Sequence, residues 1–92
     1  MKQITCFYLE TCPYCRQAKR AIEELTKENP KYNEIVIVWV EESEHPDIAD
    51  KYDYYYTPTM FLDQEKVYEA HPGEGYEECK ASVKKVFDLA LA

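Results

Sequence analysis

The chain has 92 residues, of which 46% are hydrophobic, and it carries a formal net charge of −7. This length and composition predict one folded domain over residues 1–92 with a single core, and they exclude a largely disordered chain. The charge balance is +2 over residues 1–33 and −9 over residues 34–92, which excludes the basic surface that a nucleic acid partner requires.

The location of the protein is predicted from two missing signals. The only long apolar run, residues 35–40, is far shorter than the roughly 20 residues that cross a bilayer, and residues 1–5 contain no apolar signal segment. We therefore expect a cytoplasmic protein that acts as a monomer and without a membrane. Because the cytosol is reducing, we do not expect structural disulfides among the four cysteines, which lie at positions 6, 12, 15 and 79.

The first predicted elements are a strand and a helix. Residues 4–9 are rich in β-branched and aromatic side chains and predict a strand. Thr11 is expected to cap the helix that follows, since Pro13 fits its first turn and Asn29–Pro30 ends it. The apolar residues of this helix recur at the spacing of a buried stripe, and they are Ala18, Ala21, Ile22 and Leu25.

The middle of the chain is predicted to form a second strand and a short helix. Residues 35–40 are apolar on both alternating faces, a pattern typical of a strand covered by helices on both sides of a sheet. Trp39 and its valine neighbours are therefore expected in the core. The short helix is predicted over residues 46–52.

The last third of the chain is predicted to form a hairpin and a final helix. Residues 60–62 and 66–70 read as strands joined by a turn, and apolar positions between residues 76 and 90 recur at helical spacing. The order is β-α-β-α-β-β-α, in which the first two strands are parallel through a right-handed crossover. It predicts an α/β fold with a four-stranded mixed sheet and helices on both faces.

Cys12 and Cys15 lie at the predicted junction between the first strand and the first helix. The thiolate is the nucleophile in disulfide exchange, and a helix start offers Cys12 backbone N–H groups and the positive end of the helix dipole. Arg16 adds a nearby cation, and Pro13 stiffens the turn. Cys15 can then attack a mixed disulfide on Cys12. The pattern predicts a redox-active pair, with Cys12 as the catalytic nucleophile and Cys15 as the resolving thiol.

Two other interpretations of this pair stay open, a zinc site and an inert pair. A zinc site needs two further ligands, for which His71 and Cys79 are the candidates. We expect no metal, because the chain has no second Cys-x-x-Cys and no histidine pair. Cys6 and Cys79 are expected to be structural, since free cysteine behaves as a small hydrophobic residue on a buried face. His45 and His71 are expected to have no chemical role.

Two segments of the chain resemble a known family. Residues 11–15, Thr-Cys-Pro-Tyr-Cys, resemble the active site of dithiol glutaredoxins, and residues 16–19 continue that pattern. Residues 56–62 resemble the cis-proline segment that glutaredoxins share with thioredoxins. The resemblance covers essentially the whole chain in element order and implies the thioredoxin fold. It also implies that the Thr57–Pro58 bond is cis and that Thr57 pairs with the substrate backbone.

The resemblance further implies a binding site for substrate or glutathione. Glu77 and Glu78 follow a segment with two glycines, similar to the acidic pair with which many glutaredoxins hold the amino end of glutathione. An equally good interpretation is that these acids only complement the dipole of the last helix. The implied binding residues are Pro13, Tyr14, Arg16, Thr57, Pro58, Glu77 and Glu78.

The function that follows is that of a glutaredoxin-like dithiol oxidoreductase that reduces protein disulfides or glutathione mixed disulfides, and its electron donor would be glutathione or a thioredoxin reductase. Its partners would be disulfide-containing or glutathionylated proteins. However, Leu9 stands where glutaredoxins commonly carry lysine, and Thr57-Pro58-Thr59 is more like a thioredoxin. The alternative is therefore a thioredoxin-like protein disulfide reductase recharged by a flavin enzyme, a thioredoxin reductase. A third function is a metal or iron–sulfur carrier that uses Cys12.

Overall fold

The computed structural model describes residues 2–92. The elements in chain order are β1 (Ile4–Tyr8), α1 (Pro13–Glu28), the 3₁₀ helix η1 (Pro30–Glu34), β2 (Ile37–Glu41), α2 (Pro46–Ala49), β3 (Thr59–Leu62), β4 (Glu65–Glu69) and α3 (Tyr76–Leu91). The predicted order is confirmed, and η1 is the one addition, since the sequence pattern did not indicate it. No helix among these residues has both the length and the apolar character needed to cross a membrane.

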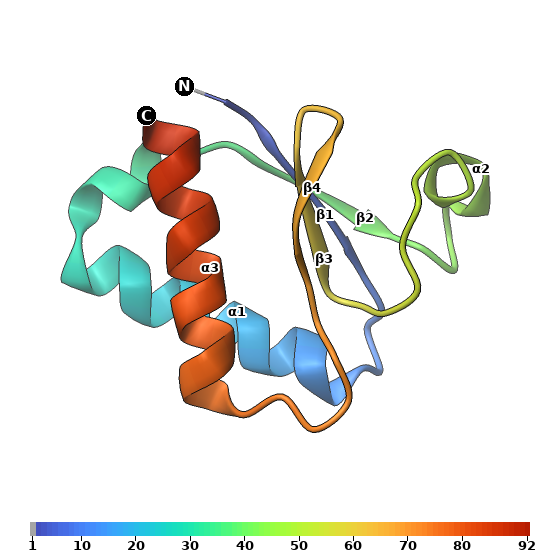
Figure 1. The fold of residues 1–92 in the computed structure, drawn as a ribbon, viewed down its shortest axis with the longest axis horizontal. Helices are drawn as coiled ribbons and strands as arrows, with labels where there is room; N and C mark the ends of the chain where they lie inside the picture. The colour runs from blue at the N-terminus through green and yellow to red at the C-terminus, as the bar shows by residue number, and fades with distance from the viewer. Residues whose placement is uncertain (1) are drawn as a thin grey trace.

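The four strands form one mixed sheet in the order β2-β1-β3-β4. β1 lies parallel to β2 and antiparallel to β3, and the β3–β4 hairpin is antiparallel. In Figure 1, α1 and α3 lie on one side of the sheet and α2 lies on the other. The predicted parallel pair, antiparallel hairpin and two-sided helix cover are therefore all present. β1 is an inner strand of the sheet. The cysteine motif follows the carboxyl end of β1 and therefore lies between the ends of neighbouring strands.

The main core lies between the sheet and the two long helices. Ile4, Cys6 and Met60 come from the sheet, and Val83 and Phe87 come from α3, all of them fully buried. The predicted stripe of α1 also faces this core, with Ala18, Ala21 and Leu25 buried and Ile22 half-buried. Burying one large apolar side chain contributes about 1.5–3 kcal/mol, so this layer holds α1, and with it the cysteine motif, against the sheet.

The prediction that the second strand is covered on both faces is wrong. β2 is an edge strand, and Val36, Val38 and Trp39 are 58%, 39% and 38% exposed. Val38 lies on the same face as α2, which has only four residues and does not cover it. Trp39 lies on the opposite face, where it packs against the Tyr8 ring and beneath the Lys19 ammonium of α1 at the margin of the core. An apolar run thus indicated a strand correctly but not its place in the sheet.

Two predicted helix boundaries also change. Cys12, rather than Thr11, is the N-cap of α1, and Pro13 is its first helical residue. Because the N-cap lies one residue later than predicted, the Thr11 side chain does not cap the helix. The predicted helix over residues 46–52 is regular only to Ala49. Beyond it, the backbone N–H of Tyr52 donates a hydrogen bond to the Ala49 carbonyl.

Candidate active site

The loop between β1 and α1 carries Cys12 and is held by a carboxylate from β2. Glu41 is 8% exposed and accepts hydrogen bonds from the backbone N–H of Glu10, at 3.1 Å, and of Ser43, at 2.7 Å. The Ser43 hydroxyl also donates to it, and these donors hold the pKa of Glu41 below its usual range. Sequence reasoning missed this residue. The one available signal was that parallel strands end at the same sheet edge, which puts the end of β2 beside the end of β1.

Cys12 is the partly exposed thiol at the start of α1. Its Sγ donates to the Thr57 carbonyl at 3.6 Å when the thiol is protonated. Burial alone raises the pKa of Cys12, but hydrogen bonds from the Thr57 side chain and from the backbone N–H groups of Cys15 and Tyr14 lower it more, so that the pKa lies below its ordinary value. Arg16 is exposed, and the stabilisation that the sequence assigned partly to its charge comes from these donors.

Cys15 is its opposite, a thiol that stays protonated. It is 3% exposed, its Sγ accepts a hydrogen bond from the Leu9 N–H at 3.5 Å, and burial raises its pKa to about 11. Cys6 and Cys79 are fully buried, and burial raises the pKa of both. All four thiols are free. Only Cys12 therefore combines access to a substrate with a stabilised thiolate.

The segment before β3 lies against Cys12 and is held by Glu69. The Thr57–Pro58 peptide bond is cis, as the resemblance implied. Glu69 Oε2 accepts hydrogen bonds from the backbone N–H groups of Tyr55, at 2.5 Å, and Tyr56, at 2.8 Å. The Tyr55 and Tyr56 side chains are 85% and 51% exposed. The backbone beside Cys12 is therefore held in place by Glu69 and is preceded by two exposed aromatic side chains.

The loop before α3 docks on the first turns of α1. The Gly73 N–H donates to the Tyr14 hydroxyl at 2.7 Å, and Gln17 Nε2 donates to the Glu74 carbonyl at 3.2 Å. Gly73 has φ +83°, a backbone conformation that side chains disfavour. Tyr14, predicted to bind substrate, thus also ties this loop to the active-site helix.

Glu77 and Glu78 occupy the first turn of α3, where the sequence placed them, but they differ in their contacts. Glu78 Oε2 lies 2.5 Å from His71 Nε2, and this contact raises the pKa of His71. Glu77 is exposed and forms no ion pair with the described residues. The alternative zinc set, Cys12 and Cys15 with His71 and Cys79, is not brought together among residues 2–92. Cys79 is instead fully buried, with its Sγ 3.4 Å from the Tyr68 hydroxyl.

Comparison with solved structures confirms the predicted thioredoxin fold. The oxidised thioredoxin of Plasmodium falciparum has a TM-score of 0.64 and 20% identity, over 97% of this chain and 80% of that one. Fasciola hepatica thioredoxin has a TM-score of 0.61 and 21% identity, over 95% and 78%. Thioredoxin 1 of Thermosipho africanus has a TM-score of 0.59 and 14% identity, over 98% and 99%.

The family is shown by sequence, since these identities by themselves show only the fold. No curated protein sequence matches the chain significantly. The sequence model of one protein family, described as thioredoxin, matches residues 2–86, which is almost the entire chain. This protein therefore belongs to the thioredoxin family.

Proposed function

We propose that this protein is a dithiol oxidoreductase that reduces disulfides in proteins or mixed disulfides between proteins and glutathione. Membership of the thioredoxin family implies thiol–disulfide exchange in general. The observation that carries the proposal is the contrast between the accessible Cys12, whose pKa is lowered, and the buried Cys15, whose pKa is about 11. A pair of this kind attacks with one sulfur and resolves with the other.

In the first step the Cys12 thiolate attacks one sulfur of the substrate disulfide. The substrate S–S bond breaks, a Cys12–substrate disulfide forms, and the second substrate sulfur leaves as a thiolate. Thr57 and the backbone beside it would pair with the substrate, because this segment already lies 3.6 Å from Cys12 Sγ. The exposed rings of Tyr55 and Tyr56, which precede Thr57, would offer apolar surface to the substrate.

In the second step Cys15 gives up its proton and attacks Cys12 Sγ. The mixed disulfide breaks, the Cys12–Cys15 disulfide forms, and the released substrate thiolate takes up the proton. The substrate gains two electrons and the protein loses two. A donor with two thiols, or two molecules of glutathione, then reduces the pair again.

For the electron donor we propose glutathione, as in glutaredoxins. The supports are the Thr-Cys-Pro-Tyr-Cys motif at residues 11–15 and the exposed carboxylate of Glu77 beside the loop that docks on Tyr14. In this arrangement Glu77 would hold the ammonium group of glutathione, and Glu78 would assist once it is released from His71.

A thioredoxin reductase is the second candidate donor, and three observations favour it. The matching family model is that of thioredoxin. Leu9 stands where a glutaredoxin would carry a lysine for the glutathione carboxylate. His71 already engages Glu78. These observations support a donor that recognises the protein surface around Cys12 rather than glutathione.

The test is to oxidise the Cys12–Cys15 pair and supply each donor system separately, with NADPH consumption as the measurement. We expect turnover with glutathione and glutathione reductase. Turnover with a thioredoxin reductase alone would reject the glutaredoxin-like proposal and keep the dithiol chemistry. A chain that neither system recharges, and that is coloured when purified without oxygen, would instead support a metal or iron–sulfur carrier.

A further inference from the structure

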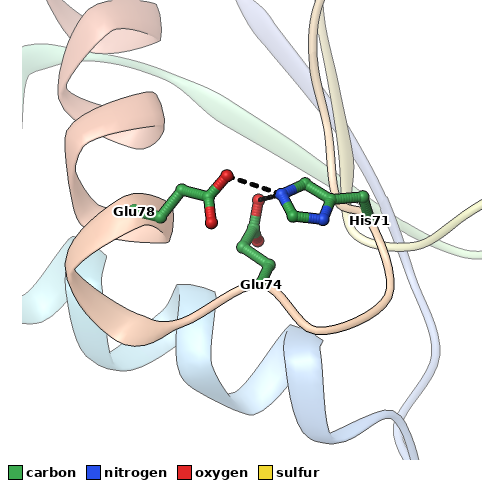
Figure 2. A group of neighbouring side chains, drawn as sticks. All are labelled: His71, Glu74 and Glu78. Atoms are coloured by element: carbon green, nitrogen blue, oxygen red, sulfur yellow. Dashed lines mark hydrogen bonds and ion pairs between the residues drawn. The ribbon is translucent and has the colours of Figure 1, made fainter.

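Three side chains converge beside the loop that docks on α1. His71 and Glu74 come from the loop before α3, and Glu78 comes from the first turn of that helix. One ligand atom from each lies within 4.8 Å of the other two, and Figure 2 shows the two carboxylates pointing at the same ring nitrogen of His71. We propose that His71, Glu74 and Glu78 form a binding site for a divalent transition metal of the zinc type.

The imidazole of His71 is oriented as in many metal-binding histidines. Its Nδ1 lies 3.1 Å from the Pro72 carbonyl, which can accept a hydrogen bond from an Nδ1–H group. Metal-binding histidines usually donate their second ring N–H to a carbonyl or carboxylate, which leaves the other nitrogen to coordinate the metal. Here that other nitrogen is Nε2, which lies 2.5 Å from Glu78 Oε2 and 4.0 Å from Glu74 Oε1. A cation at Nε2 would neutralise both carboxylates.

Glu74 is a second and independent indication of a ligand. Its side chain is 2% exposed, which is unusual for a carboxylate without a charged partner at hydrogen-bond distance. Oε2 accepts a hydrogen bond from the Tyr68 hydroxyl at 2.5 Å. Within residues 2–92 no hydrogen-bond donor reaches Oε1, the oxygen that points toward His71. The site thus contains a largely buried carboxylate side chain whose Oε1 faces His71 Nε2 and the position that a metal would fill.

The distances fit a zinc ion after small movements. Zinc binds nitrogen and oxygen at about 2.0–2.2 Å, so tetrahedral ligand atoms lie about 3.4 Å apart. The two distances from Nε2, 2.5 Å and 4.0 Å, lie on either side of this value. Glu78 is 54% exposed and His71 52% exposed, so both side chains can rotate. One imidazole and two carboxylates favour zinc or a neighbouring transition metal over Mg²⁺ or Ca²⁺, and water would be the fourth ligand.

A metal at this site would act on the same loop that contacts α1. It would join residues 71 and 74 to the first turn of α3, while Gly73 and Glu74 bind Tyr14 and Gln17 of α1. The loop would then be held on both sides. Since the inference concerns metal binding alone, it does not depend on the proposed redox function.

The test is calorimetric titration of the full chain with Zn²⁺, in a background in which Cys12 and Cys15 are replaced by serine so that these thiols do not bind the metal. We expect one Zn²⁺ per chain, with affinity reduced at least tenfold by His71→Gln and by Glu78→Gln. The matched controls are His45→Gln, which removes the other histidine, and Glu77→Gln, which removes the neighbouring acid. Neither control should change the affinity.

Co²⁺ provides a second measurement that does not depend on affinity. We expect visible absorption typical of nitrogen and oxygen ligands, without sulfur-to-metal charge transfer, and we expect it to disappear in His71→Gln. Circular dichroism would verify that each variant is folded. Zinc binding that persists in both His71→Gln and Glu78→Gln would overturn the proposal, as would an equal loss in His45→Gln or no binding of Zn²⁺ by the background protein.

Discussion

The two long helices, α1 and α3, have sixteen residues each, but their first turns differ in charge. α1 has no acidic residue there, and its N-cap, Cys12, forms no side-chain capping bond. α3 has Glu77 and Glu78 in its first turn and a glycine as N-cap. Every helix start presents unpaired N–H groups and a partial positive charge. In α3 the carboxylates of Glu77 and Glu78 interact with that positive charge. In α1 no carboxylate does so, and the charge can stabilise the Cys12 thiolate.

The reactive end of α1 depends on the absence of an acidic residue from its first turn. A carboxylate near Cys12 would compete with the thiolate for the same N–H groups and would repel it. The structure instead places neutral donors there, the Thr57 side chain and the backbone amides of Tyr14 and Cys15. The following predictions test this difference, from the largest expected effect to the smallest.

The largest effect is expected from removing either sulfur of the pair at α1. Cys12→Ser should abolish activity on every substrate, because no other accessible thiolate is present among the described residues. Cys15→Ser should keep substantial glutathione-dependent activity on a small glutathionylated substrate, since a second glutathione can release the group from Cys12. The same variant should lose activity on protein disulfides. Equal loss in both assays would show that Cys15 is needed for more than resolution.

The next effect concerns the order in which the thiols react with an alkylating reagent. At mildly acidic pH Cys12 should be modified first, because its pKa is lowered and that of Cys15 is raised to about 11. Because each pKa unit changes the thiolate population about tenfold, the opposite shifts of the two pKa values favour reaction at Cys12 strongly. Raising the pH should narrow this preference. Mass spectrometry of the digested protein would identify the site, and preferential labelling of Cys79 would contradict the assignment.

A few-fold effect on glutathione use is expected at α3. Replacing both Glu77 and Glu78 by glutamine should weaken it, because an exposed ion pair with the ammonium group is worth at most about 1 kcal/mol. Leu9→Lys should act in the opposite direction by supplying a partner for a glutathione carboxylate. The measurement is the KM for glutathione, with activity under a thioredoxin reductase as the control. An unchanged KM in both variants would remove these residues from the glutathione site.

A smaller effect tests the missing acid in α1 directly. Tyr14→Glu should raise the pKa of Cys12, and Tyr14→Gln is the matched control, because both variants lose the contact with Gly73. A charge near a helix start is worth about 0.3–1 kcal/mol, which corresponds to a few tenths of a pH unit. The measurement is the pH dependence of the alkylation rate. If the two variants have the same profile, charge in the first turn does not control Cys12.

An effect of similar size, on stability rather than on reactivity, is expected at the acidic first turn of α3. Glu77→Gln should lower the free energy of unfolding by about 0.3–1 kcal/mol, because a carboxylate at a helix start interacts favourably with the dipole. The difference should shrink as salt is added, since Glu77 is exposed. Urea unfolding of both proteins at low and high salt would measure it. A difference that does not depend on salt would point to lost packing instead.

Local patterns in the sequence were enough for much of the fold. Ala18, Ala21 and Leu25 recur at helical spacing, and all three are buried. The hairpin formed by β3 and β4 also appears where its apolar segments and turn predicted it. These predictions succeed because helix and strand periodicity is a property of neighbouring residues. The same pattern misplaced Trp39, because an apolar run does not record which strands lie at the edge of a sheet.

Local patterns in the sequence were enough to predict the order of the main helices and strands and the cysteine pair at a helix start, and the family resemblance added the segment around Pro58. Three contacts could not be predicted and are seen in the fold alone: the Thr57 carbonyl lies 3.6 Å from Cys12 Sγ, Glu41 accepts a hydrogen bond from the Glu10 N–H, and His71 faces two carboxylates. The first two contacts join residues 45 and 31 positions apart. Such contacts form because β1 is central in the sheet and brings distant loops to one edge, and no local periodicity contains that information.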